Sequence, residues 1–225
     1  MKVLVIAAHP DDEVYGMGGT IAKLSEQGHQ VYVLIITDGC TSQYRNSENI
    51  NDIIYKKQRE TRIANEILGV KEVFFCDLPD MHLNEVPHVT VNEKIEAIIK
   101  SIKPEEVYTH FYGDVNLDHQ IVYKSTLVAT RPIPNQSVKR LYAYSVPSST
   151  EWTPHSPGTS FLPNVFSDIK NYINIKEMAI KAYETEVRNY PHPRSCESVK
   201  ALDLAVGLQC GLESCESFVL LRSLV

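Results

Sequence analysis

Cysteine, long apolar runs and basic clusters are scarce in this sequence, and each scarcity excludes a class of protein. The 225 residues include five cysteines, which are odd in number, far apart and without a Cys-x-x-Cys pair. Neither a disulfide framework nor a thiolate zinc site is therefore expected. No apolar run approaches the roughly 18–20 residues that span a bilayer, and the N-terminal one stops after six residues at His9. The sequence predicts neither a signal peptide nor a membrane anchor, and it favours the reducing cytoplasm.

The charge balance favours a small-molecule ligand over a polyanionic partner. The chain carries a formal net charge of −6 and is 43% hydrophobic and 22% charged, which are ordinary proportions for a folded soluble protein. Nucleic acid and anionic lipid both require a positive surface. We therefore expect no nucleic-acid partner and no membrane insertion.

Apolar runs rich in β-branched residues alternate with segments of helical periodicity over the first two thirds of the chain. This alternation predicts an α/β fold, in which a parallel sheet carries helices on both faces. In the segment 91–103, apolar residues recur on one stripe that faces the sheet. The predicted strands are 2–8, 29–37, 71–76, 105–110 and 140–145, and the predicted helices are 18–27, 52–68, 91–103 and 118–130.

The remaining third has a different character. Segment 146–164 contains four prolines and the single tryptophan, Trp152, so it is interpreted as an irregular loop that forms a substrate lid or a subunit contact in a homo-oligomer. A short strand near 165–166, helices over 174–187 and 196–208, and an apolar run at 218–221 follow it. We expect one domain over 1–225, with an α/β core at 1–145 and a C-terminal helical extension within 146–225 that folds over the strand ends.

Carboxylates follow each of the first four predicted strands. In an open parallel sheet the loops at the carboxyl ends of the strands converge on the ligand crevice, so these side chains are expected to meet. They are Asp11, Asp12 and Glu13 after the first strand, Asp38 after the second, Asp77 and Asp80 after the third, and Asp114 and Asp118 after the fourth.

A divalent metal would offset the repulsion among these carboxylates. Two histidines and one carboxylate are typical of a catalytic zinc site with an open position for water, and His9, Asp12 and His119 can supply them. Asp11 could then take a proton from that water during attack on a carbonyl. The alternative interpretation is capping, because Asp11 and Asp12 suit the start of one helix and Asn116 the start of another.

The run Ala-His-Pro-Asp-Asp-Glu at 8–13, followed about a hundred residues later by Asn-Leu-Asp-His at 116–119, resembles the PIG-L (LmbE-like) family of zinc-dependent N-acetylglucosaminyl deacetylases. Further similarity favours a bacterial branch of that family associated with surface-polysaccharide sugars. It lies at 60–70, 113–119, 130–132, 147–152 and 190–195.

The resemblance implies a Rossmann-like α/β fold, one Zn²⁺ per chain, and removal of the acetyl group from an amino sugar to give acetate and free amine. By position, His9, Asp12 and His119 become the zinc ligands, Asp11 the general base, and Asp118 the carboxylate that holds a neighbouring group in place. The chain departs from the family at Asn116, where many members have a histidine that acts as general acid and oxyanion stabiliser.

Asparagine can donate a hydrogen bond but cannot transfer a proton at neutral pH. Either Asp11 therefore carries the proton to the leaving amine, or another residue does, for which His192, between two prolines, is the candidate. Sugar-binding side chains are expected on loops at the rim of the crevice. The predicted substrate-binding residues are Asp38, Arg45, Asp80, Asn116 and Arg194.

The predicted function is metal-dependent N-deacetylation of a small amino-sugar compound, which could be a free sugar, a glycoside or a sugar nucleotide. Two rivals remain. Clustered aspartates could bind Mg²⁺ in a metal-dependent phosphoesterase, and a sugar-binding homologue could have lost catalysis with the replacement at Asn116.

Overall fold

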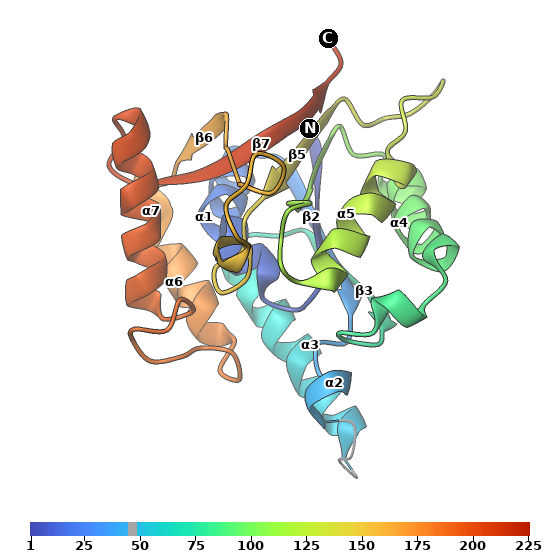
Figure 1. Cartoon of the computed structure of the whole chain (residues 1–225), viewed down its shortest axis with the longest axis horizontal. Helices are drawn as coiled ribbons and strands as arrows, with labels where there is room; N and C mark the ends of the chain where they lie inside the picture. Colours follow the sequence, from blue (N-terminus) through green and yellow to red (C-terminus); the bar gives the residue numbers. More distant parts are fainter. Residues whose placement is uncertain (45–48) are drawn as a thin grey trace.

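A seven-stranded sheet organises the chain, and its strand order is β3-β2-β1-β4-β5-β7-β6. The computed structural model describes residues 1–44 and 49–225. The first five strands are parallel, whereas β7 runs antiparallel to both β5 and β6 (Figure 1). The strands are β1 (Lys2–Ala7), β2 (Gln30–Thr37), β3 (Glu72–Leu78), β4 (Glu106–His110), β5 (Arg140–Tyr144), β6 (Val165–Asp168) and β7 (Cys215–Ser223).

Helices cover both faces of the sheet, as the alternating pattern predicts. The side chains of β1 are buried on both faces: Val3 and Val5 pack on one side with α1, α3, α6 and α7, and Leu4 and Ile6 pack on the other with α4 and α5. This burial on both faces explains why the sequence of β1 is apolar without interruption after Lys2. The helices are α1 (Asp12–Glu26), α2 (Thr41–Tyr44), α3 (Ile50–Ile67), α4 (His88–Ile102), α5 (Leu117–Ala129), α6 (Ile173–Ala182) and α7 (Cys196–Cys210), with short 3-10 turns η1 (Leu83–Glu85), η2 (Thr150–Trp152) and η3 (Lys170–Tyr172).

The first helix begins earlier than predicted. The sequence predicts a helix over 18–27, yet α1 starts at Asp12 and has non-helical dihedral angles at Met17. The glycines in this stretch permit close packing, because a Cβ at Gly16 would lie 2.5 Å from the Tyr144 ring and one at Gly19 would lie 2.9 Å from Ile169. Tertiary packing against Tyr144 and Ile169 therefore outweighs the weak helix propensity of glycine.

The C-terminal third extends the sheet. The apolar run at 218–221 belongs to β7, which pairs with β5 through Tyr144 and Phe218 and with β6 through Val165 and Phe218. Helix α6 ends at Ala182 rather than at the predicted 187. The segment 183–195 between α6 and α7 then reaches the carboxyl ends of the parallel strands, where Arg194 contacts Asp11.

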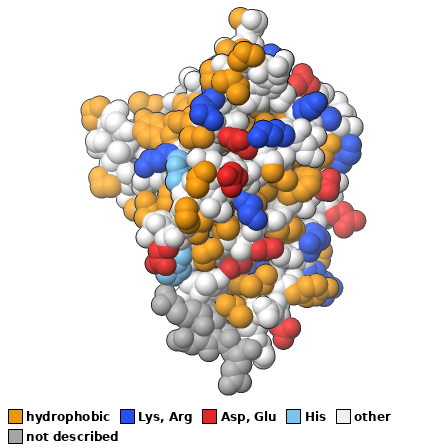
Figure 2. Space-filling model, turned by 90° about the vertical axis from the view of Figure 1, so that its right-hand side faces the viewer, with side chains coloured by type: hydrophobic (Ala, Val, Ile, Leu, Met, Phe, Trp, Pro, Cys, Tyr) orange, Lys and Arg blue, Asp and Glu red, His pale blue; other side chains and the backbone are white. Residues whose placement is uncertain are grey.

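The surface mixes charges of both signs. On the face that Figure 2 shows, basic and acidic side chains alternate and do not gather into one basic patch. In the described part of the chain, no helix combines the length and the apolar character that crossing a bilayer requires.

Candidate metal centre

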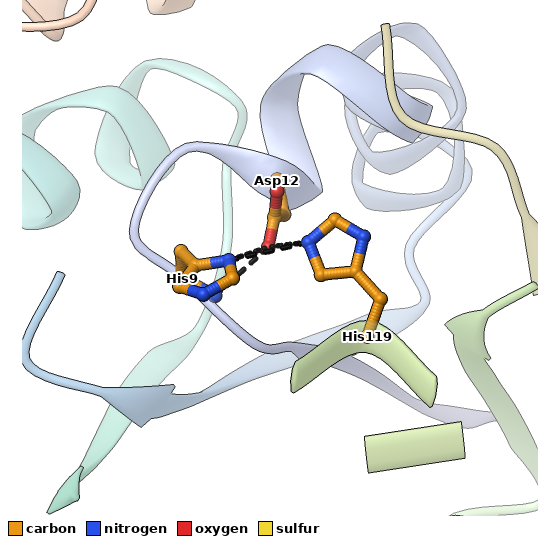
Figure 3. A group of neighbouring side chains, drawn as sticks. All are labelled: His9, Asp12 and His119. Carbon is orange, nitrogen blue, oxygen red and sulfur yellow. Dashed lines mark hydrogen bonds and ion pairs between the residues drawn. The ribbon is translucent and has the colours of Figure 1, made fainter. Parts of the chain in front are cut away.

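The carboxyl ends of the parallel strands bring the three predicted ligands together (Figure 3). His9 lies in the turn after β1, Asp12 is the first residue of α1, and His119 lies in the first turn of α5. The His9 backbone N–H donates to Asp12 Oδ2 over 2.8 Å, so the turn orients the carboxylate. All three residues are buried, and His9 keeps 9% of its surface exposed.

The spacing of the three donor atoms fits a small divalent metal. His9 Nδ1 lies 3.1 Å from Asp12 Oδ2 and 3.2 Å from His119 Nε2, and His119 Nε2 lies 3.3 Å from Asp12 Oδ2. Ligands bonded at about 2.0–2.1 Å to a tetrahedral zinc are about 3.3–3.4 Å apart. The observed triangle therefore matches the size that such an ion requires.

Each histidine also has a carboxylate at its other ring nitrogen. His9 Nε2 lies 3.3 Å from Asp118 Oδ2, and His119 Nδ1 lies 3.1 Å from Asp114 Oδ2. Metal-ligating histidines almost always have such a partner, which fixes the tautomer and directs the free lone pair to the ion. The two carboxylates therefore leave His9 Nδ1 and His119 Nε2 as acceptors that face the same point.

Asp118 and Asp114 are themselves held by several donors. Asp118 accepts hydrogen bonds from the backbone N–H groups of Met81 and Leu83, at 2.8 and 3.2 Å. Asp114 accepts from the hydroxyls of Ser149 and Thr150, at 2.5 and 2.6 Å. Although burial raises the pKa of Asp114, its bonds with His119 and the hydroxyls lower it to about 2. The sequence places Asp114 at a strand end but does not reveal this role.

Asp12 is also ionised. Burial raises its pKa, but His119 and His9 beside it hold that pKa well below its usual range. Its Oδ1 atom is buried and has no hydrogen-bond partner among the described residues. A buried carboxylate needs positive charge beside it, which a metal bound between His9 and His119 would supply.

His110 completes the surroundings without being a ligand. Its Nε2 accepts a 2.7 Å hydrogen bond from the Ala8 N–H, and its ring stacks on that of His119 with centroids 3.9 Å apart. Burial and the neighbouring His119 lower its pKa well below the usual value. It is therefore a neutral packing partner of His119.

Asp11 sits beside the centre in an unusual backbone conformation. Its φ of 107° lies in the left-handed region, which costs a residue other than glycine on the order of 1–3 kcal/mol. The Glu13 carboxylate stabilises this turn by accepting the Asp11 N–H at 3.1 Å. Glu13 in turn accepts from Asn65 and Tyr183. The strained turn directs the Asp11 side chain into the cleft.

The two oxygens of the Asp11 carboxylate have different partners. Oδ2 accepts from Arg194 Nη1 over 3.0 Å, whereas Oδ1 is buried without a hydrogen-bond partner among the described residues. Burial raises the pKa of Asp11 to about 6, although Arg194 opposes that rise. A carboxylate with one free oxygen and a raised pKa is suited to proton transfer.

Arg194 belongs to a charge network that the sequence does not reveal. Its Nη1 atom also donates to Glu186 Oε2 over 3.0 Å, and the other Glu186 oxygen binds Lys57 Nζ. Lys57 and Glu186 are 129 residues apart, and no local motif links them. Arg194 lies at the cleft as predicted, but its charge is already paired with two carboxylates.

The remaining predicted residues separate into three groups. Asp80 and Asn116 line the cleft. Asp38 does not line it, because its Oδ1 accepts the backbone N–H groups of Cys40 and Thr41. Arg45 lies outside the described residues.

His192 is not brought to the centre. Its Nδ1 accepts the Arg194 backbone N–H over 3.1 Å, and its ring is not part of the cleft wall. The structure thus places it where it supports the backbone of Arg194, away from the position that the predicted proton donor would need.

A cleft of about 110 Å³ opens at this centre. Asn116 caps α5, because its Oδ1 accepts the Asp118 N–H at 2.9 Å. The cleft is lined by His9, Pro10, Asp11, Gly39, Ser42, Asp80, Met81, Asn116, Glu186 and Arg194. Beside the cleft, two histidines and a carboxylate could hold a metal ion, and Asp11 has an unpartnered oxygen.

Comparison with known proteins gives the family. Residues 4–130 match the profile of the PIG-L family, described as GlcNAc-PI de-N-acetylase. The chain belongs to the PIG-L family. It is 30% identical over 192 residues to the uncharacterized deacetylase YaiS of Escherichia coli, which covers 81% of this chain and 90% of YaiS. This confirms the resemblance seen in the two motifs, and the chain is a member of a deacetylase enzyme family.

Other PIG-L relatives have named substrates. The diacetylchitobiose deacetylase of Thermococcus kodakarensis is 28% identical over 82% of this chain and 70% of its own length. A probable N-acetyl-alpha-D-glucosaminyl L-malate deacetylase 2 of Bacillus cereus is 28% identical over 82% of this chain and 83% of its own length. The solved N,N'-diacetylchitobiose deacetylase of Pyrococcus horikoshii superposes with a TM-score of 0.79 at 23% identity, covering 98% of this chain and 84% of that one, which confirms the α/β fold.

Proposed function

We propose that this PIG-L protein is a zinc-dependent deacetylase that hydrolyses the N-acetyl group of a small amino-sugar compound. The observation that carries the proposal is the triangle of His9, Asp12 and His119 beside the unpartnered oxygen of Asp11. The deacetylase relatives support the reaction type, and the amino-sugar substrates named for two of them support the substrate class.

His9 Nδ1, Asp12 Oδ2 and His119 Nε2 would hold the zinc. Two imidazoles with one carboxylate favour zinc over magnesium, which prefers an all-oxygen shell. Zinc bound there would act as a Lewis acid that lowers the pKa of a water molecule and polarises the acetyl carbonyl. A second set of three, His9 with Asp80 and Asp118, fits less well because the Asp118 oxygens already accept two backbone N–H groups.

Asp11 would act first as general base toward the attacking water and then as general acid toward the leaving amine. Its free Oδ1 takes a proton from the attacking water as the new bond between oxygen and the acetyl carbon forms. It then returns that proton to the amide nitrogen as the carbon–nitrogen bond breaks, so that acetate and free amine leave. Arg194, bound to Oδ2, holds the carboxylate in place during both transfers.

Asn116 would stabilise the negative charge that develops on the carbonyl oxygen. Its Oδ1 is committed to the Asp118 N–H, so its Nδ2 group must extend away from the helix. There Nδ2 has Met81 Sδ at 3.5 Å as a partner, and a thioether is a weak acceptor. The amide can therefore turn its N–H groups to a substrate oxygen, which is the part of the missing histidine's role that asparagine can fill.

The direct test measures acetate release from the methyl glycoside of N-acetylglucosamine by zinc-loaded protein. The wild type is expected to release acetate, and Asp11→Asn is expected to lose about 10²–10⁴-fold in turnover because it lacks the base while it keeps its zinc. Asp77→Asn, at an exposed aspartate, is the matched control and should be unchanged.

Two outcomes would overturn the proposal. Loss of zinc in Asp11→Asn would make Asp11 a ligand. Sugar binding without any acetate release would favour the non-catalytic homologue, and hydrolysis of nitrophenyl phosphate with Mg²⁺ in place of deacetylation would favour the phosphoesterase.

A further inference from the structure

We propose that Glu186 makes this cleft select an uncharged amino sugar over an anionic one, because its carboxylate binds both Arg194 and Lys57 beside the cleft. The inference rests on the proposed deacetylase function and adds the substrate class. Glu186 comes from the loop after α6 and is 7% exposed. Its two carboxylate oxygens bind different partners, Arg194 through Oε2 and Lys57 through Oε1, and the half-exposed Arg188 lies 3.6 Å from Oε2.

The cleft wall is acidic. Among the described residues that line it, Asp11, Asp80 and Glu186 are carboxylates, and Arg194 is the only lysine or arginine. A sugar phosphate or a sugar carboxylate would need a cationic donor that is not already neutralised. Apart from the charge of a bound metal, the wall can therefore attract an anion only as far as Arg194 is available.

Arg194 is held by carboxylates on its cleft side. Its Nη1 donates to Asp11 and to Glu186, both at 3.0 Å, and its Nε donates to Ser148 Oγ at 2.9 Å. An anion that bound this guanidinium would have to come close to the two carboxylates that Arg194 already binds. Like charges at such distances are costly in a partly desolvated site.

Lys57 adds a second cation behind the first. It extends from α3, is 3% exposed, and donates through Nζ to Glu186 and to Thr185 Oγ1. Glu186 therefore separates two positive charges and compensates both. Neutralising Glu186 would remove the carboxylate that Arg194 and Lys57 share, and this side of the cleft would become more positive.

The relatives do not decide the question, because their named substrates include both a neutral disaccharide and a malate glycoside. The network at Glu186 favours the neutral substrate for this chain. A neutral sugar hydroxyl can accept from Arg194 or donate to Asp80 without adding charge, whereas a phosphate adds up to two negative charges to an acidic wall.

The test compares the methyl glycoside of N-acetylglucosamine with N-acetylglucosamine 1-phosphate and 6-phosphate. For the zinc-loaded wild type, kcat/KM for acetate release is expected to be at least about tenfold higher for the glycoside. Glu186→Gln should shrink this ratio about tenfold, and Lys57→Met, which removes a cation, should enlarge it. Glu184→Gln, at an exposed neighbour, is the matched control and should leave the ratio unchanged.

Binding measured calorimetrically on metal-free protein gives a second readout that does not depend on turnover. Tighter binding of the glycoside than of the phosphates, with opposite shifts of this preference in Glu186→Gln and Lys57→Met, supports the inference even if no substrate is deacetylated. Absence of deacetylation would then refute the proposed function alone. Tighter binding of either phosphate by the wild type would overturn the inference. A ratio that does not respond to Glu186→Gln in a variant with unchanged Tm would overturn it as well.

Discussion

Replacing Asp114 by asparagine should weaken zinc binding although Asp114 is not a ligand. Its Oδ2 lies 3.1 Å from His119 Nδ1 and accepts from Thr150 Oγ1, while Oδ1 accepts from the Asn116 N–H and from Ser149 Oγ. Every neighbour of the carboxylate therefore presents a donor. An asparagine amide has one oxygen, so in either orientation its NH₂ group must face a donor.

The magnitude follows from that conflict. If the amide oxygen stays with the Asn116 N–H, the NH₂ group faces His119 Nδ1 and disfavours the tautomer that leaves Nε2 free for a metal. Loss of such a carboxylate partner typically costs 10–100-fold in metal affinity, which is about 1.4–2.7 kcal/mol. If the amide flips, the loop containing Ser149 loses its anchor and the ligand is less well positioned.

Zinc affinity would be measured by competition with a chromophoric chelator at pH 7. Asp52→Asn, at an exposed aspartate in the first turn of α3, is the control and should retain the wild-type Kd. The reasoning fails if Asp114→Asn binds zinc as tightly as the wild type while its Tm shows that it is folded, because His119 would then not depend on its carboxylate partner.

Three further changes test other parts of the account. Burial raises the pKa of Asp11 and Arg194 lowers it. Arg194→Gln should therefore raise this pKa and move the acid limb of the pH profile of kcat to higher pH by about one unit. An acid limb that stays in place would contradict the role of Asp11 as base. Asn116→Ala and Asn116→Ser should both lose about 10²–10³-fold in kcat. In a urea titration, only the alanine variant should also lose about 1 kcal/mol in the free energy of unfolding, since serine keeps the helix cap. Equal stabilities of the two variants would argue against the cap. Lys176→Met should lower the free energy of unfolding by about 3–5 kcal/mol, because the buried lysine pairs with Asp203 and Glu216, which would both lose their cation. The exposed Lys181→Met is the control and should leave the midpoint of the urea titration unchanged.

The sequence predicts the core of the fold and of the site for a physical reason. Loops that follow neighbouring parallel strands must end at the same edge of the sheet, so His9, Asp12 and His119 meet although His9 and His119 are 110 residues apart. The alternation of apolar and helical segments marks those strands in the sequence. Their order in space and the antiparallel direction of β7 have no comparable local signature.

The contacts that sequence analysis misses are long-range pairs of single residues. Lys57 looks like a surface lysine on a helix, and its burial becomes visible only when the loop after α6 brings Glu186 against it. His192 and Arg194 lie in one stiff segment, and the backbone turns that segment so that Arg194 faces Asp11 and His192 does not line the cleft. The spacing of residues in the sequence cannot choose between these two outcomes.

The most direct test of the account is the zinc content per chain, measured by elemental analysis of protein purified without chelators. The account predicts close to one zinc in the wild type and in His155→Ala, an exposed histidine, and almost none in a folded His119→Ala. A wild type that holds no zinc even after equilibration with it, or a His119→Ala variant that keeps its zinc, would contradict the assignment of His9, Asp12 and His119 as the metal site.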